Sequence, residues 1–368
     1  MPAERFRVAL IGAGGFGRNM LRALCDCPLV ELVGVSDLDA SAASSASAEA
    51  GCPVYIDHRR LLVETRPAGA FLTVPPAPSA ELVRLASHCG SHVWKESPLA
   101  RNLHEAVSLC RLTESAGRRF VIGTQRRFMG GYRRGKELLG RLGKVYLVQA
   151  HYLFNLGAVL GWRGDKAAGG GALINLGYHV FDLVVWLMGL PETVYAVAGT
   201  RQPLGGSQGR PAGSPAGVDQ PVYDTEDTVS VAFRYTDKAA AVITVSRCFD
   251  PVSEGLLVYG EGGSLSVGPD RCLLRDRDGA AIETFQADER PAAVFAREVE
   301  AFVRASAGSV SGYPCSGWEN LLTMAAIEAA YLSDRTHQPE SPAALLAGHE
   351  VAARDCLRFA PVDEANDQ

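Results

Sequence analysis

The chain has 368 residues, of which 47% are hydrophobic, and a formal net charge of −5 at pH 7. A chain of this length has room for about two domains, each able to bury its own core. A weakly acidic chain without a basic stripe is not expected to bind nucleic acid.

The sequence predicts neither a membrane span nor a metal centre. The longest apolar stretch, Val180–Leu190, contains Asp182 and is too short to cross a bilayer. The N-terminal residues lack the basic start and the small-residue cleavage site of a signal peptide. The nine cysteines lack the spacing typical of metal ligands, so reduced thiols are expected. We therefore expect a cytoplasmic protein with no metal and no membrane partner.

The first part of the chain alternates short apolar runs with segments of helical periodicity. Such alternation predicts a parallel, doubly wound sheet, which we place at residues 1–123. The expected strands are Phe6–Ile11, Val30–Val35, Val54–Ile56, Gly69–Leu72, His92–Lys95 and Arg119–Gly123, and the expected helices include Asn19–Cys25, Ala80–Cys89 and Leu103–Ala116.

The rest of the chain, residues 124–368, has a different pattern and predicts a second domain. Long alternating segments indicate a mainly antiparallel sheet with two helices. The Gly-, Pro- and Ser-rich stretch at 202–220 is expected to be a flexible insertion. The expected strands are Lys144–Phe154, Thr228–Tyr235, Ala240–Arg247, Leu256–Tyr259 and Ser264–Val267, and the helices are Ala172–Leu190 and Trp318–Ser333.

A glycine-rich segment directly after the first expected strand indicates a dinucleotide-binding Rossmann domain. In the pattern G-x-G-x-x-G, the first glycine permits a tight turn and the second lets main-chain N–H groups approach a pyrophosphate. The third lets the helix pack closely on the strand. We therefore assign the following residues to a cofactor site at a helix N-terminus: Gly12, Gly14, Gly15, Phe16 and Gly17.

An acidic residue stands where a Rossmann domain uses one to bind the adenosine ribose. Asp37 follows the second expected strand, about 20 residues after Gly17. Its carboxylate would repel a 2′-phosphate, and no Lys or Arg lies between Asp37 and Gly51 to neutralise one. NAD is therefore predicted as the cofactor rather than NADP. The plain alternative is a glycine turn with a surface aspartate.

Several further segments resemble the glucose-fructose oxidoreductase / inositol dehydrogenase (Gfo/Idh/MocA) family, and the resemblance covers nearly the whole chain. They comprise Val74-Pro75-Pro76, similar to the family's "TPP"; His92–Ala100, similar to "HVxxEKPLA"; Gln125–Phe128, similar to "NRRF"; and Trp162-Arg163 with Gly169–His179, similar to "WR…GGGxLxDxGxH". Glu226-Asp227-Thr228 and the Trp318–Ser333 segment continue the match.

The resemblance implies a fold, a substrate class and an assembly. It implies a Rossmann domain followed by an α/β domain with a large open sheet, one face of which is commonly buried in homodimers or homotetramers. It also implies a sugar, cyclitol or nucleotide-linked sugar as substrate, oxidised or reduced at a secondary alcohol. Pro75, Glu96 and Gln125 would join the cofactor site.

The positions that match the family's catalytic trio are Ser97, Asn175 and His179. Only the histidine is kept, since the family places lysine and an acidic residue at the other two positions. A histidine is suited to exchange a proton with a substrate hydroxyl because its ordinary pKa is about 6.5. Asn175, His179 and Asp182 are spaced four and three apart on one helix and should share a face. A hydrogen-bonded core histidine is the alternative.

The missing family lysine leaves open which group assists His179. Ser97 can hydrogen-bond a substrate hydroxyl but cannot act as a net base alone. Lys95 lies two residues earlier, so on a strand it would share a face with Ser97. Its backbone starts roughly 6–7 Å away, a gap that its side chain could span. Lys95 is therefore a candidate replacement, and a surface or nucleotide-side lysine is the alternative.

Five residues are candidates to contact the substrate: Arg127, Trp162, Arg163, Lys166 and Tyr178. Arg127 would shape the floor near the nicotinamide, and Tyr178 with Tyr152 would stack on a sugar ring. Salt bridges are the alternative for Arg163 and Lys166, and core packing is the alternative for the aromatic side chains.

Three functions compete. The leading one is an NAD-dependent dehydrogenase or ketoreductase with His179 as acid/base. The second is a non-redox net reaction, an epimerisation or elimination, in which NAD takes and returns a hydride. The third is an NAD-binding protein with impaired catalysis, which the serine at position 97 motivates.

Overall fold

The computed structural model describes residues 5–156, 161–201, 223–309 and 312–360. The stretch predicted to be a flexible insertion, 202–220, lies outside these residues. The chain forms two compact units. Unit 1 contains residues 1–129, 288–321 and 351–368, and unit 2 contains residues 130–287 and 322–350. The first crossing between the units lies six residues after the predicted boundary at 123, and the chain later returns to unit 1 twice.

A six-stranded parallel sheet forms the centre of unit 1. Its order is β3-β2-β1-β4-β5-β6, so the direction of winding reverses between β1 and β4, as in a Rossmann fold. The strands are β1 (Phe6–Ile11), β2 (Val30–Ser36), β3 (Val54–Tyr55), β4 (Gly69–Leu72), β5 (His92–Glu96) and β6 (Phe120–Gly123). Each lies within one residue of its predicted bounds at either end, which confirms this part of the prediction.

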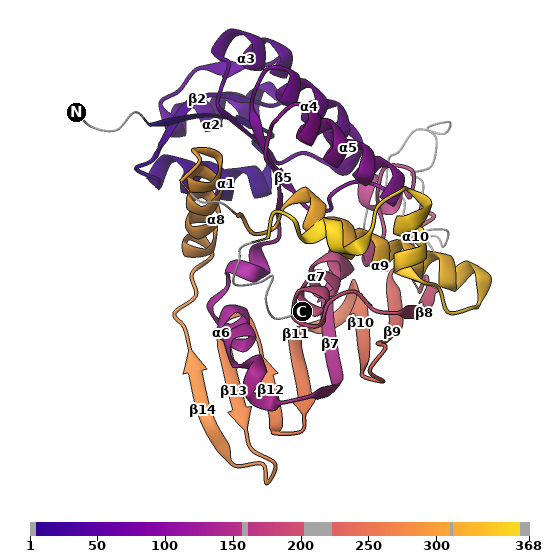
Figure 1. The fold of residues 1–368 in the computed structure, drawn as a ribbon. Coiled ribbons are helices and arrows are strands. Elements are labelled where there is room, and N and C mark those ends of the chain that lie inside the picture. Colours follow the sequence, from indigo (N-terminus) through magenta and orange to yellow (C-terminus); the bar gives the residue numbers. More distant parts are fainter. Residues whose placement is uncertain (1–4, 157–160, 202–222, 310–311, 361–368) are drawn as a thin grey trace, which may run out of the picture. The chain divides into compact units, whose positions relative to one another are not determined.

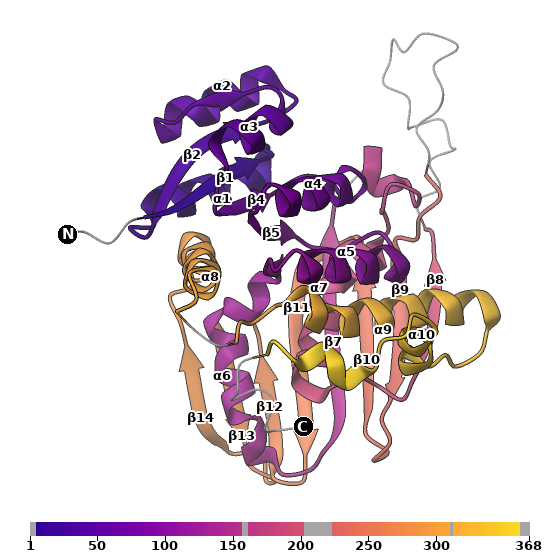
Figure 2. The same cartoon turned by 45° about the horizontal axis from the view of Figure 1, so that its top comes forward.

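Helices in two groups accompany this sheet (Figures 1 and 2). α1 (Gly15–Asp26) packs against α2 (Ala40–Ala50) and α8 (Pro291–Ser306), whereas α4 (Pro76–His88) packs against α3 (His58–Thr65) and α5 (Leu103–Ser115). Right-handed crossovers on either side of the winding reversal place such groups on opposite faces of the sheet. α8 comes from the distant 288–321 segment and completes the layer beside α1.

Unit 2 is built on an eight-stranded sheet of order β14-β13-β12-β11-β7-β10-β9-β8. All pairs are antiparallel except β7 with β10, which confirms the mainly antiparallel prediction. The strands are β7 (Val145–Asn155), β8 (Thr193–Gly199), β9 (Thr228–Arg234), β10 (Ala240–Ser246), β11 (Cys248–Gly260), β12 (Gly263–Val267), β13 (Arg271–Arg275) and β14 (Ala281–Gln286).

Helices cover one face of the unit 2 sheet. α6 (Gly130–Leu138) packs on β12, β13 and β14, and α7 (Tyr178–Met188) packs on β7 and β10. Along β9, Val229, Val231 and Phe233 are buried while the alternate residues are exposed, the period expected when one face is covered. The remaining helices are α9 (Gly317–Thr336), which spans both units, and α10 (Pro342–Gly348). No helix of the described residues is long and apolar enough to span a bilayer.

Candidate active site

The glycine-rich turn between β1 and α1 has the geometry that the sequence predicted. Gly12 has a φ of +97°, and a Cβ at this position would lie 2.7 Å from the Thr73 carbonyl oxygen. A Cβ at Gly17 would lie 2.2 Å from the Gly12 carbonyl oxygen, so α1 can approach the turn only with glycine here. By contrast, Gly14 is exposed and a Cβ there would meet nothing within 4 Å. A side chain would therefore clash at Gly12 or Gly17, whereas the space beside Gly14 is open.

The N-terminus of α1 offers main-chain donors to an anion. Gly14 provides no side-chain cap, and the first turn of the helix contains no acidic residue. The first N–H groups of a helix have no intrahelical acceptor, and the helix dipole is positive at this end. Together with the open space above Gly14 and Gly15, these features fit a dinucleotide pyrophosphate.

Asp37 lies directly beside this turn. Its Oδ2 accepts a hydrogen bond from the Ala13 N–H at 2.6 Å, and its Oδ1 accepts one from the Asp39 N–H at 2.9 Å. The side chain is only partly buried. The carboxylate is thus held at the carboxyl end of β2, where a Rossmann domain binds the adenosine ribose.

A second group of predicted cofactor residues meets at the ends of β5 and β6. The Gln125 Nε2 donates to Glu96 Oε2 at 2.9 Å, and the Ser97 Oγ donates to Glu96 Oε1 at 3.3 Å. Packing around the carboxyl raises the pKa of Glu96 to about 8, because desolvation disfavours its charged form. Pro75, in the connection between β4 and α4, is exposed and directly precedes α4.

Lys95 is buried, with 1% of its surface exposed. Its Nζ donates to the main-chain carbonyls of Glu96, at 2.9 Å, and Pro98. Burial lowers the pKa of Lys95 to about 8. These bonds hold the ammonium group against the turn that carries Ser97, and they favour a structural role for this lysine. The alternative of a surface lysine is wrong, because the side chain is buried.

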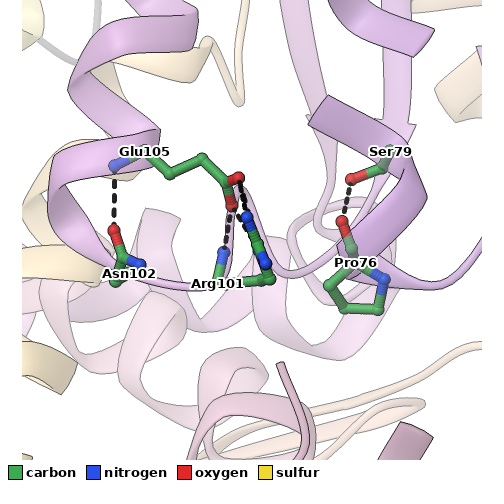
Figure 3. A network of polar contacts seen from close by, with 5 residues as sticks. All are labelled: Pro76, Ser79, Arg101, Asn102 and Glu105. Carbon is green, nitrogen blue, oxygen red and sulfur yellow. Dashed lines mark hydrogen bonds and ion pairs between the residues drawn. The ribbon is translucent and has the colours of Figure 1, made fainter. Parts of the chain in front are cut away.

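The chain after this turn is fixed by the start of α5 (Figure 3). The Asn102 Oδ1 caps the helix by accepting from the Glu105 N–H at 2.9 Å, and Arg101 pairs with the Glu105 carboxylate at 2.7 Å. An asparagine cap of this type contributes about 1 kcal/mol. The contacts anchor the segment that leads from Ser97 into α5.

Arg127 is buried and forms an ion pair with Glu319, whose carboxylate also accepts from the Cys315 N–H at 3.0 Å. This ion pair was not anticipated from the sequence. A role for Arg127 in contacting the substrate remains a proposal.

In unit 2, Asn175 lies in a single π-helical turn, Leu173–Gly177, which directly precedes α7. Its Nδ2 donates to the carbonyls of Gly171 at 2.9 Å and Gly169 at 3.2 Å. Both amide hydrogens are thereby used, so Oδ1 is the atom left to accept from a substrate hydroxyl. π-turns inside helices are frequent at functional sites.

His179 is the second residue of α7 and is partly buried. Asp182, one turn later, is fully buried and accepts from the Thr323 Oγ1 at 3.3 Å. This bond ties α7 to α9 and agrees with a structural role for Asp182. Asn175 and His179 thus belong to one continuous helical segment of unit 2, whereas Lys95 and Ser97 belong to unit 1.

The remaining predicted substrate residues lie in the segment before the π-turn or in α7. The Arg163 guanidinium lies over the Trp162 ring at 4.6 Å, and the Lys166 ammonium lies over the Tyr331 ring at 5.1 Å. Tyr178 is fully buried, so its ring serves packing in this structure.

Two residues with clear roles near these sites were missed from the sequence. Thr73 donates from Oγ1 to the Gly12 carbonyl at 2.6 Å and fixes the turn. Glu226 accepts from the Leu173 N–H at 2.8 Å and from the Tyr331 hydroxyl at 2.9 Å, which anchors the π-turn. Glu226 stood in a segment similar to the family, but only the folded structure shows its partners.

Two family models match this chain, one in its N-terminal part and one in its C-terminal part. Residues 6–124 match a family model described as "Oxidoreductase family, NAD-binding Rossmann fold", and residues 132–266 match the GFO/IDH/MocA C-terminal domain. Rhizopine catabolism protein MocA of Rhizobium meliloti is 26% identical over 67% of this chain and 73% of that protein. D-glucoside 3-dehydrogenase of Escherichia coli is 27% identical over 62% of this chain and 66% of that protein.

The fold has a close match among solved structures. A levoglucosan dehydrogenase in complex with NADH and levoglucosan superposes with a TM-score of 0.82. The match covers 92% of this chain and 99% of that one, at 19% identity.

Proposed function

Since the chain belongs to the Gfo/Idh/MocA family of NAD-binding oxidoreductases, we propose that it is an NAD-dependent dehydrogenase or ketoreductase acting on a secondary alcohol. The substrate would be a sugar, a cyclitol or a nucleotide-linked sugar. Relatives named D-glucoside 3-dehydrogenase and inositol 2-dehydrogenase support this class. The observation that carries the proposal is the open glycine turn beside Asp37, joined in one chain to a helix bearing Asn175 and His179.

The residues of unit 1 would hold the cofactor. Gly14 and Gly15 would present N–H groups to the pyrophosphate, and Asp37 would accept from the adenosine ribose hydroxyls. Glu96, Pro75 and Gln125 would border the nicotinamide half. When bound, NAD supplies the hydride acceptor for alcohol oxidation.

His179 would exchange the substrate proton. In the oxidation direction its imidazole takes the hydroxyl proton, and in reduction it returns one to the alkoxide. Asn175 would orient the same hydroxyl through Oδ1, since Gly169 and Gly171 fix its amide group. Histidine is suited to this exchange because an imidazole can both accept and return a proton near neutral pH, and the His179 side chain is partly buried.

His179→Ala tests this assignment. Turnover of the best polyol should fall by a factor on the order of 10²–10⁴, the contribution of a positioned proton-transfer group. NAD binding should survive, because the proposed cofactor residues belong to unit 1. The matched control is His151→Ala, since His151 lies on β7 of the same unit and contacts Ser253. Full activity in His179→Ala would contradict the assignment.

Ser97, in place of the family lysine, supports a second candidate function. Without that lysine, the site would suit a non-redox epimerisation or elimination in which the hydride is returned. Purified protein that carries NAD and converts its substrate without net NADH formation would favour this candidate. Steady NADH production from a polyol would favour the dehydrogenase.

We also propose that the chain forms a homo-oligomer through the uncovered face of the unit 2 sheet. Four apolar side chains on this face are 38–59% exposed: Tyr195, Val197, Val242 and Leu257. We call these four residues the outer-face patch. Strand register brings Tyr195 and Val242 into one row through Ala232, and Leu257 into the same row through Gln149. An exposed apolar patch on a sheet is typical of a surface buried by a partner.

A further inference from the structure

Gly171 is in close contact with both Glu226 and Asn175 in unit 2. Its carbonyl oxygen accepts from both nitrogens of Asn175, from the main-chain N–H at 3.1 Å and from Nδ2 at 2.9 Å. A Cβ at Gly171 would lie 2.6 Å from Glu226 Oε1 and 2.7 Å from the Tyr331 hydroxyl oxygen. Its φ of +135° also favours glycine. Gly171 therefore connects the carboxylate of Glu226 to the amide of Asn175.

Glu226 also holds the two residues that follow Gly171. Its main-chain carbonyl accepts from the Ala172 N–H at 3.0 Å, and its Oε1 accepts from the Leu173 N–H at 2.8 Å. These residues begin the helical segment that carries Asn175, where N–H groups have no acceptor within the helix. The positive end of the helix dipole also favours a carboxylate here. Glu226 thus fixes three consecutive residues at the start of this segment.

The Glu226 carboxylate is itself held in place. The side chain is buried, and the hydroxyl of Tyr331, on α9, donates to Oε1 at 2.9 Å. The Lys166 ammonium lies 5.1 Å from the centre of the Tyr331 ring. The preceding residue, Thr225, accepts at Oγ1 from the buried Arg247 Nη2 at 2.7 Å. A buried carboxylate with two donors and an anchored neighbour has little freedom to move.

Asn175 is the point at which this arrangement meets the proposed substrate. Its side chain is partly exposed, whereas residues 171–174 are buried. Because the amide nitrogen donates to the Gly171 carbonyl, a displacement of Gly171 would move the amide and with it Oδ1. Oδ1 is the atom proposed above to accept from the substrate hydroxyl.

We propose that Glu226 is a positioning residue, which acts through Gly171 to set where the Asn175 amide lies and so how the substrate hydroxyl is oriented. This inference rests on the proposed function, which assigns Asn175 to that hydroxyl. Misplacing a positioning group by about 1 Å can cost on the order of 10²-fold in rate. The reach of the Glu226 side chain carries the effect, since the Leu173 N–H and the Tyr331 hydroxyl need only an acceptor oxygen.

Glu226→Asp and Glu226→Gln separate reach from charge. Aspartate keeps the charge but withdraws the carboxylate by one carbon–carbon bond, about 1.5 Å. Glutamine keeps the length and an acceptor oxygen. We expect kcat for the best polyol to fall by a factor on the order of 10–10² in Glu226→Asp and to stay within about threefold of wild type in Glu226→Gln. NAD affinity should be unchanged in both, because the proposed cofactor residues belong to unit 1.

Glu192→Asp is the matched control, because Glu192 is an exposed glutamate of the same unit, 3.8 Å from Arg234. The same shortening at this position should leave kcat unchanged. Equal losses in Glu226→Asp and Glu226→Gln, or a loss in Glu226→Gln alone, would show that the charge matters rather than the reach and would overturn the proposal.

A double-mutant cycle with Asn175→Ala tests the route of the effect. If Glu226 acts through the Asn175 amide, Glu226→Asp should cost little more in kcat once that amide is absent. A residue that only supported the fold would instead give losses that add. Additive losses in folded proteins would therefore overturn the proposed route.

Amide hydrogen exchange gives a readout that does not need turnover. The peptide covering residues 171–177 should exchange faster in Glu226→Asp than in wild type or Glu226→Gln, because the Leu173 N–H loses its acceptor. Unchanged exchange, or full turnover in Glu226→Asp, would overturn the proposal. Full activity in His179→Ala would instead contradict the proposed function, so the two failures are distinguishable.

Discussion

The Asp37 carboxylate accepts a hydrogen bond from the Ala13 N–H at 2.6 Å, which joins the end of β2 to the glycine turn. The second carboxylate oxygen accepts from the Asp39 N–H at 2.9 Å. The negative charge is therefore fixed in position before any cofactor binds. A preformed charge at this place favours ribose hydroxyls and disfavours a 2′-phosphate.

The double variant Asp37→Ser with Leu38→Arg should shift the preference from NAD toward NADP, because a repelling charge is lost and a phosphate partner is gained. Leu38 is 86% exposed, so an arginine fits there without repacking. Leu38→Arg alone is the control and should shift the preference less, since Asp37 remains. Dissociation constants for both cofactors measure the effect. Wild-type binding of NADP tenfold tighter than NAD, about 1.4 kcal/mol, would contradict the charge argument.

Alanine substitutions at Gly14 and Gly17 should separate folding from cofactor binding. A Cβ at Gly17 would lie 2.2 Å from the Gly12 carbonyl oxygen, so Gly17→Ala should lower the melting temperature. A Cβ at Gly14 would meet nothing within 4 Å, so Gly14→Ala should melt as the wild type does. Its methyl group would occupy the space proposed for the pyrophosphate and should weaken NAD binding. Equal NAD affinity in a folded Gly14→Ala protein would argue against that position.

His92 should make stability depend on pH in the mildly acidic range. Its Nδ1 accepts from the Arg119 N–H at 2.9 Å, and burial with nearby Arg118 and Arg119 lowers its pKa from 6.5 to about 4. Because the folded-state pKa is lower, the unfolded chain binds the extra proton first. This stabilising contribution is present above pH 6.5 and is lost as the pH falls toward 4.

The variant His92→Asn keeps an acceptor but cannot take up that proton, so the slope of unfolding free energy against pH between about 4 and 6.5 should become flatter. Denaturant unfolding at several pH values measures it. His104→Asn, at an exposed position on α5, is the control. The same slope in wild type and His92→Asn would show that other groups account for the acid sensitivity.

Val242→Asp should weaken the proposed assembly. Val242 is 45% exposed in the outer-face patch, and burying an aspartate in an apolar interface is costly. Light scattering should show a smaller oligomer without a change in secondary structure. Val63→Asp, at an apolar residue of α3 that is 55% exposed, controls for a surface charge. An oligomer of unchanged size in Val242→Asp would contradict the proposal that the outer-face patch forms the interface.

The sequence predicted the structural features that depend on residues close together in the chain. The glycine turn, Asp37 and the unit 1 strands follow from short-range patterns, and the structure reproduces them. The helix predicted at Ala172–Leu190 is observed as a π-turn followed by α7. The Leu173 N–H of this π-turn donates to Glu226, which is distant in sequence. α8, which packs against α1, was missed. Pairings between such distant residues leave no periodicity in the chain.

The role of Lys95 can be decided by its contacts and by mutation. Its Nζ donates to the Glu96 and Pro98 carbonyls, and a side chain bound in this way positions the Ser97 turn. We expect Lys95→Met to lower stability, because each buried carbonyl left without a donor costs about 1–3 kcal/mol. Turnover per folded molecule should stay within about tenfold of wild type, since His179 carries the proton exchange. A loss on the order of 10²–10⁴ would show that Lys95 itself transfers protons.

Restoring the family residue with Ser97→Lys gives the complementary test. The Ser97 hydroxyl donates to Glu96, so a lysine at position 97 would replace a neutral hydrogen bond with a cation. That cation would crowd the turn and repel an oxidised nicotinamide, so NAD⁺ affinity and polyol oxidation should both fall. NADH affinity should change less, because its ring carries no charge. A marked gain in polyol oxidation would mean that the natural protein is a weakened dehydrogenase, and would favour the non-redox function.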